Sequence, residues 1–198
     1  PHGVAAAAST IDVVGGVPLA SRYGREFRAS GVVWGALDNE VVSLDGTTLL
    51  NTQDNLVSLG GRGNNLASRY YNPQFCIRQA LTADGTGRGI FNCVNGNNWV
   101  NQVTTLPYQQ YAMDTTLVDA ANGNRLVEVV AGLSGFATRS SSQALADGVV
   151  SRDGCDGIVV QLTDTNGDNR FETIAKVDTD CAVAFEFYDF FNVPWAEF

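Results

Sequence analysis

The sequence has one histidine, one lysine and no apolar stretch of the ~18 residues that a membrane span requires. The histidine is His2, and a Ser-His-Asp or Cys-His mechanism needs a histidine held beside its nucleophile. A zinc site built from cysteine and histidine is also disfavoured, because the chain has a single histidine. We therefore expect no enzyme and no membrane span. The enzymatic alternative left open is glycoside hydrolysis by a carboxylate pair, with Asp38, Glu40, Asp114 and Glu128 as candidates.

Positive charge is also scarce. The chain has 12 lysine and arginine residues against 21 aspartate and glutamate residues, which gives a net charge of −9. An acidic surface repels a phosphate backbone, so we expect no nucleic-acid partner.

Long amphipathic helical patterns are missing, whereas glycine is abundant, with 21 residues, and aromatic residues make up 10%. Many short strands joined by turns fit this composition. We predict an all-β, mostly antiparallel β-sandwich, of the jelly-roll or Ig-like kind, with at most one or two short helices. Residues 1–20 are expected to form a flexible N-terminal arm or the first strand, and residues 21–198 a single β domain.

The clearest predicted hairpin joins strands at 112–118 and 124–131 through Asn122-Gly123. A short helix is predicted at 142–147, capped by Ser142 and ended by Gly148. The other predicted strands are at 10–14 with 17–19, 27–37 with 40–44, 66–71, 74–81, 90–94 and around Phe185 and Phe187.

Oxygen-bearing side chains recur at alternate positions late in the chain, at Asp164, Asn166, Asp168 and Glu172. Arg170 occupies the intervening position, where its backbone carbonyl would serve as a ligand. Calcium binds six to eight oxygens, and a tight loop can supply most of them. Apolar, β-branched segments at 157–162 and 173–177 flank the loop, which predicts a calcium site at the tip of a β-hairpin.

The pattern D-x-N-x-D resembles the first half of EF-hand and dockerin loops. An EF-hand has glycine at its sixth position and glutamate at its twelfth, where this chain has Asn169 and Ala175. Glutamate at the ninth position, Glu172, instead resembles the strand–loop–strand calcium sites of β-propeller and integrin-type repeats. The alternative is a polar turn that binds no ion, because aspartate, asparagine and glycine are ordinary turn residues.

The four cysteines are Cys76, Cys93, Cys155 and Cys181, and no pair has C-x-x-C spacing. An even number in an acidic, lysine-poor chain suggests two disulfides and an oxidising compartment. Three pairings are compatible with four cysteines. We favour Cys76–Cys93 and Cys155–Cys181, because the second pair would clamp the base of the calcium hairpin.

Three aromatic residues, Trp99, Tyr108 and Tyr111, follow one another among asparagines and glutamines. Exposed rings beside amides are typical of sugar-binding surfaces, so these residues are candidates for stacking against a glycan. The alternative is that the rings pack in the core of the sheet, which is the ordinary place for aromatic strand residues.

These features predict a secreted protein of the extracellular space or cell surface, with its signal peptide already removed. We expect a calcium-binding structural or adhesive protein that assembles with copies of itself into a filament, its N-terminal arm adding a strand to the next subunit. The alternative is a carbohydrate-binding β-sandwich module that uses the three aromatic residues.

Overall fold

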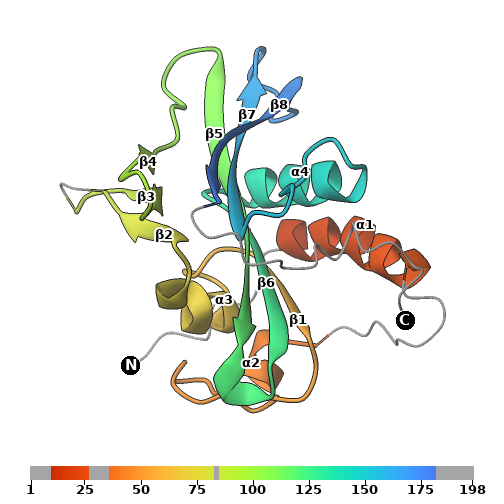
Figure 1. Ribbon diagram of the computed structural model, residues 1–198. Coiled ribbons are helices and arrows are strands. Elements are labelled where there is room, and N and C mark those ends of the chain that lie inside the picture. Colours follow the sequence, from red (N-terminus) through yellow and green to blue (C-terminus); the bar gives the residue numbers. More distant parts are fainter. Residues whose placement is uncertain (1–9, 27–35, 83–84, 182–198) are drawn as a thin grey trace.

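The part of the chain that the structure describes is mostly β, with eight strands in two sheets (Figure 1). The structure is a computed structural model and describes residues 10–26, 36–82 and 85–181. The helices are few and short, and the sandwich-like arrangement of the sheets agrees with the fold class that the sequence predicts.

The larger sheet has five strands in the order β1-β6-β5-β7-β8. Neighbouring strands are antiparallel except for β1 and β6, which run parallel. The bounds of these strands are β1 Leu56–Leu59, β5 Tyr108–Asp119, β6 Arg125–Gly132, β7 Gly157–Asp164 and β8 Thr173–Asp180.

A smaller sheet, in the order β2-β3-β4, covers one face of the larger sheet. Its strands are β2 Ile77–Leu81, β3 Arg88–Asn92 and β4 Asn98–Trp99. Ile77 and Ile90 of the small sheet pack with Met113, Val129 and Val159 of the large sheet in one buried cluster. The short helices α3 Leu66–Tyr71 and η1 Asn72–Gln74 lead into β2, and α2 Asp38–Val41 precedes β1.

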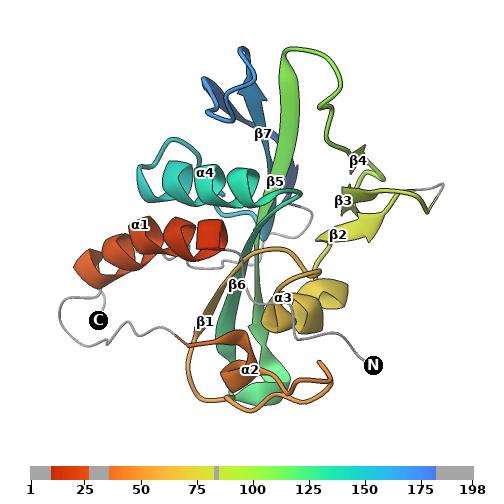
Figure 2. The same ribbon diagram turned by 180° about the vertical axis from the view of Figure 1, so that it is seen from behind.

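Two helices, α1 Thr10–Glu26 and α4 Gly135–Ala146, cover the opposite face (Figure 2). Leu19, Ala137 and Leu145 of these helices pack with Val130 and Val160. Successive residues of a strand point to opposite faces, so Val129 and Val130 enter different clusters. Because both faces are covered, apolar residues follow one another without alternation in part of a central strand, as at Ile158-Val159-Val160 of β7.

The predicted strand at 10–19 is wrong, because these residues belong to helix α1. The helix also runs across residue 20, where we expected an arm or first strand to end. Gly15 and Gly16, which separate the predicted strands at 10–14 and 17–19, instead permit close packing. A Cβ on Gly15 would lie 3.0 Å from Cα of Arg139 in α4, and one on Gly16 would lie 2.6 Å from Leu59 Cδ1. Tertiary packing outweighs the local breaker signal.

Two further strand predictions are corrected. Residues 66–71 form α3, where the Asn65 side chain caps the helix by accepting a hydrogen bond from the Ser68 amide. Residues 38–41 form α2. The predicted helix at 142–147 begins earlier, with Ser134 as its cap, and Gly148 follows its last turn with a φ of 71°.

Both hairpins that were predicted most clearly are confirmed. The turn between β5 and β6 contains Gly123 and Asn124, with φ values of 81° and 57°. Strands β7 and β8 pair antiparallel on either side of the candidate calcium loop. His2, most of the predicted strand at 27–37, and the predicted strand around Phe185 and Phe187 lie outside the described residues.

Gly24→Ala tests the assignment of residues 10–26 to a helix. A Cβ at Gly24 would meet no atom within 4 Å, so only backbone propensity should change. Alanine favours a helix over glycine by about 0.8–1.0 kcal/mol in a helix interior, and we expect stabilisation of about 0.5 kcal/mol this close to the helix end. The free energy of unfolding in denaturant measures the effect, and a loss of stability would contradict the helix.

Gly132→Ala should destabilise the protein, in contrast to Gly24→Ala, because Gly132 is closely packed. Its Cβ would lie 2.4 Å from the Thr138 backbone nitrogen and 2.6 Å from Ala137 Cβ. We expect a loss of about 1–3 kcal/mol, because the first turn of α4 has to move away from β6. An unchanged unfolding midpoint would mean that α4 and β6 do not approach this closely.

Candidate metal site

The predicted calcium loop, residues 164–172, joins β7 to β8 at one end of the large sheet (Figure 1). Asp164 is the last residue of β7, is buried, and pairs with Tyr108 of β5. The loop closes where the Glu172 amide donates to the Thr163 carbonyl at 3.0 Å. Both ends of the loop are therefore fixed by the strand ladder.

The Asp164 carboxylate organises the backbone of the loop. Its Oδ1 accepts hydrogen bonds from the amides of Asn166 at 3.2 Å and Gly167 at 2.7 Å. Its Oδ2 accepts one from the Asn169 amide at 2.8 Å. The chain therefore winds around a single carboxylate.

The next two oxygen-bearing side chains, Asn166 and Asp168, each accept a hydrogen bond from the amide two residues further along. Asn166 Oδ1 accepts from the Asp168 amide at 2.9 Å, and Asp168 Oδ1 accepts from the Arg170 amide at 2.8 Å. These side-chain turns are typical of aspartate and asparagine.

The sixth position of the loop, Asn169, has a φ of 61°. This is the left-handed conformation that glycine adopts most readily and asparagine tolerates better than most residues. The departure from the EF-hand pattern at this position is therefore accommodated. Gly167 also has a positive φ, of 82°.

The structure brings three acidic side chains together. Carboxylate oxygens of Asp164, Asp168 and Glu172 lie within 4.8 Å of one another, so the cluster could hold a metal ion. Glu172 also accepts the Thr165 amide at 2.7 Å, which ties it back across the loop. Three carboxylates at this separation repel one another unless a cation or protons neutralise them.

The environment of Asp164 favours its charged form. Burial acts to raise its pKa, but hydrogen bonds from the amides of Gly167, Asn169, Asn166 and Asp168 outweigh burial, and the pKa lies below its usual value. This candidate ligand is thus already ionised at neutral pH.

The three candidate sugar-stacking residues have different surroundings. Tyr111 is buried, with 5% of its surface exposed, and its ring centroid lies 5.3 Å from that of the half-buried Trp99. Both belong to the cluster between the two sheets. Tyr108 lies beside the metal loop, where its ring is 3.4 Å from the position of a Cβ on Gly167.

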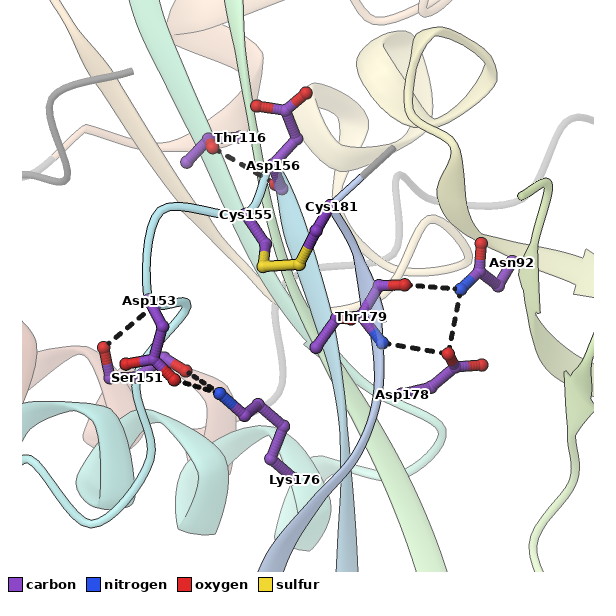
Figure 3. The surroundings of a disulfide bond; sticks show 10 residues. All are labelled: Asn92, Thr116, Ser151, Asp153, Cys155, Asp156, Lys176, Asp178, Thr179 and Cys181. Carbon is purple, nitrogen blue, oxygen red and sulfur yellow. Dashed lines mark hydrogen bonds and ion pairs between the residues drawn. A yellow bond between two sulfur atoms is a disulfide. The ribbon is translucent and has the colours of Figure 1, made fainter. Parts of the chain in front are cut away.

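Both favoured disulfides, Cys76–Cys93 and Cys155–Cys181, are present. The second lies at the end of β7 and β8 opposite the metal loop, and Figure 3 shows its surroundings. Beside it the Asp156 carbonyl accepts the Thr116 amide at 2.7 Å, and the Asp156 amide donates to the Asp180 carbonyl at 3.1 Å. The β7–β8 hairpin is thus closed covalently at its base.

The four carboxylates considered for glycoside hydrolysis each contact other groups of the protein. Asp114 and Glu128, on adjacent strands, have no exposed surface, and Arg152 lies 3.4 Å from the first and 3.9 Å from the second. Glu128 also accepts the Tyr23 hydroxyl from α1. Asp38 and Glu40 accept the backbone amides of Leu66 and Leu37, at 2.8 Å and 2.7 Å.

Sequence reasoning missed a carboxylate that links the two sheets. Asp178 of β8 accepts side-chain hydrogen bonds from Asn92, Asn95, Asn97 and Trp99, at 2.8–3.1 Å. Figure 3 shows the bond from Asn92, together with the bond from the Thr179 amide. The donors gather in residues 92–99, but nothing local identifies an acceptor about eighty residues later.

The comparisons with known proteins give no relative. No family model, no curated protein and no solved structure matches the chain. Among the helices of the described residues, none combines the length and apolar character needed to span a membrane.

Asp178→Asn should weaken the contact between the sheets, because an amide group would face donors that now meet a carboxylate oxygen. Hydrogen bonds to charged groups contribute about 1.5–3 kcal/mol, so we expect a stability loss on the order of 1–3 kcal/mol at neutral pH. Asp147→Asn, at an exposed carboxylate, should change stability by less than about 0.5 kcal/mol.

The pH dependence gives a second measurement on the same variant. Burial acts to raise the pKa of Asp178, but hydrogen bonds from Trp99, Asn97 and Asn95 outweigh it and the pKa is lowered. The stabilisation is therefore present above the unfolded-state value of about 3.9 and is lost as pH falls through the folded-state pKa. Denaturant unfolding below pH 4 should be less steeply pH-dependent in Asp178→Asn, and parallel profiles would contradict this role.

Proposed function

We propose that this chain is an extracellular calcium-binding structural protein that associates with copies of itself. The observation that carries the proposal is the loop at 164–172, where three carboxylates converge on a backbone wound around Asp164. Such a loop supplies hard oxygen ligands without reorganising on binding.

The ligand chemistry favours calcium over other divalent ions. Residues 164–172 contain neither cysteine nor histidine, which zinc prefers. Magnesium demands a near-ideal octahedron and retains several waters, whereas calcium accepts many oxygens at irregular angles. A loop that offers carboxylate, amide and carbonyl oxygens at irregular angles suits calcium best.

Two disulfides support the extracellular assignment. Disulfides persist in oxidising compartments and are rare where thiols are kept reduced. Together with a cation at the other end of β7 and β8, the Cys155–Cys181 bridge would hold this hairpin at both of its ends.

The structural role is supported by what the acidic side chains do. Asp114, Glu128 and Arg152 form a buried charged cluster, and Asp38 and Glu40 bond backbone amides, so these groups serve folding. Residues 10–26 are engaged as a helix in the core, so self-association is better supported through another surface than through strand exchange by this segment. The burial of Tyr111 weakens the carbohydrate-binding alternative.

Calcium titration of the wild type and of Asp168→Asn tests the proposal. A ligand at 100 times its Kd stabilises the folded state by about 2.7 kcal/mol. In a chain of 198 residues this raises Tm by roughly 5–10 °C. Asp168→Asn should lose most of this rise, because one of the three carboxylates is gone.

Without calcium, Asp168→Asn should be no less stable than the wild type. Removing one of three clustered carboxylates relieves repulsion, and we expect Asp168→Asn to match or exceed wild-type stability by up to about 1 kcal/mol in chelator. Asp147→Asn, which removes a charge elsewhere, should respond to calcium as the wild type does. A wild type whose unfolding and calorimetric titration are both indifferent to calcium would end the proposal.

A further inference from the structure

A long uncharged stretch interrupts this acidic chain. Residues 89–113 contain no aspartate, glutamate, lysine, arginine or histidine, although the whole chain carries a net charge of −9. The stretch is instead rich in asparagine, glutamine and apolar residues.

Much of this stretch lies on the surface. In residues 93–107, which we call the neutral strip, every residue is exposed except the partly buried Trp99 and Asn101. Four large apolar side chains are among them: Val94 at 49%, Val100 at 40%, Val103 at 49% and Leu106 at 52% exposed. Single exposed apolar residues are ordinary, but several along one uncharged segment suggest a contact surface.

The neutral strip lies away from the helix layer and ends at the metal loop. Figures 1 and 2 show β4 and the chain leading to β5 on the side of the large sheet opposite α1 and α4. At the end of the strip, Leu106 Cδ2 is 3.6 Å from the position of a Cβ on Gly167. The strip and the candidate calcium site therefore adjoin.

Hydrogen bonds hold the neutral strip in one shape. Asn95, Asn97 and Trp99 bond the Asp178 carboxylate, and Gln102 and Gln109 exchange backbone hydrogen bonds at 2.8 Å. Asn101 Oδ1 accepts the Tyr111 amide at 2.9 Å. A surface already ordered in the free protein loses little entropy when a partner binds.

We propose that the neutral strip is the surface through which one copy of this chain binds a second copy. Two copies of charge −9 repel each other, and a segment that carries no charged side chain is where they approach at least cost. Interface cores are likewise depleted of charged residues. The inference rests on the proposed function, since calcium in the adjacent loop neutralises carboxylates beside the contact and strengthens it.

The same features argue against an anionic polymer and against a glycan. An anionic polymer needs arginine or lysine, and the neutral strip has neither. A glycan needs an open aromatic face, whereas the one aromatic ring of the strip, Trp99, packs against the buried Tyr111.

Sedimentation of the wild type and of Val103→Glu/Leu106→Glu over a concentration series in calcium tests the proposal. The wild type should form dimers or larger species, and the variant should associate at least tenfold more weakly because each interface then gains two negative charges per copy. The matched control is Leu44→Glu/Leu50→Glu, which adds the same charge at side chains 67% and 58% exposed. It should associate only slightly more weakly than the wild type.

A photocrosslinking residue at Thr104 gives a second readout that does not depend on introduced charge. It should crosslink to a second copy in calcium, whereas the same residue at Thr47 should not. A wild type that stays monomeric at millimolar concentration in calcium, or a strip variant that associates as the wild type does, would overturn the inference.

Calorimetry on the same samples separates this inference from the calcium proposal. Calcium binding without association would refute the neutral strip and leave the metal site standing. Association through the strip without calcium binding would support the surface and refute the metal site. Thermal unfolding confirms that each variant is folded before its association is compared.

Discussion

The pairing of β7 with β5 is the interaction on which the other features of this protein depend. Its register runs from Tyr108 opposite Asp164 at one end to Thr115 opposite Gly157 at the other. The first pair fixes the start of the metal loop, and the second brings the Cys155–Cys181 bridge beside the sheet. Because helices cover one face of these strands and the small sheet covers the other, a shift in this register would displace both core clusters.

Carboxylates, in addition to the two apolar clusters, connect the parts around this sheet. The Glu128 carboxylate accepts a hydrogen bond from Tyr23 of α1, and the Asp178 carboxylate accepts one from Trp99 of the small sheet. The Asp164 carboxylate accepts hydrogen bonds from backbone amides of its own loop, such as that of Gly167. A buried carboxylate without partners is costly, so each is surrounded by donors or by Arg152. An acidic chain can in this way use its charge for folding and still keep some surface free of charge.

Local patterns were sufficient for some of the structure. Asn122-Gly123 indicated the β5–β6 hairpin, and the cysteines on either side of predicted strands indicated both disulfides. The alternate oxygen-bearing side chains of residues 164–172 indicated three carboxylates that the structure brings together. Helix α1 was missed because its paired glycines look like a break unless the position of Arg139 is known. Asp178 was missed because its partners are distant in the sequence. In both cases the deciding contact is tertiary.

The irregular pairing of the outer strand has a consequence for larger assemblies. Within the described residues β8 is one edge of the large sheet, and its register to β7 shifts between Val159 and Val160. Lys176 lies on this edge strand, where its side chain is held by Asp153 and the Ser151 carbonyl. Bulges and lysines discourage main-chain pairing between molecules. If copies associate as proposed above, they would therefore not pair main chain to main chain along β8, and the large sheet would not continue into a second molecule at this edge.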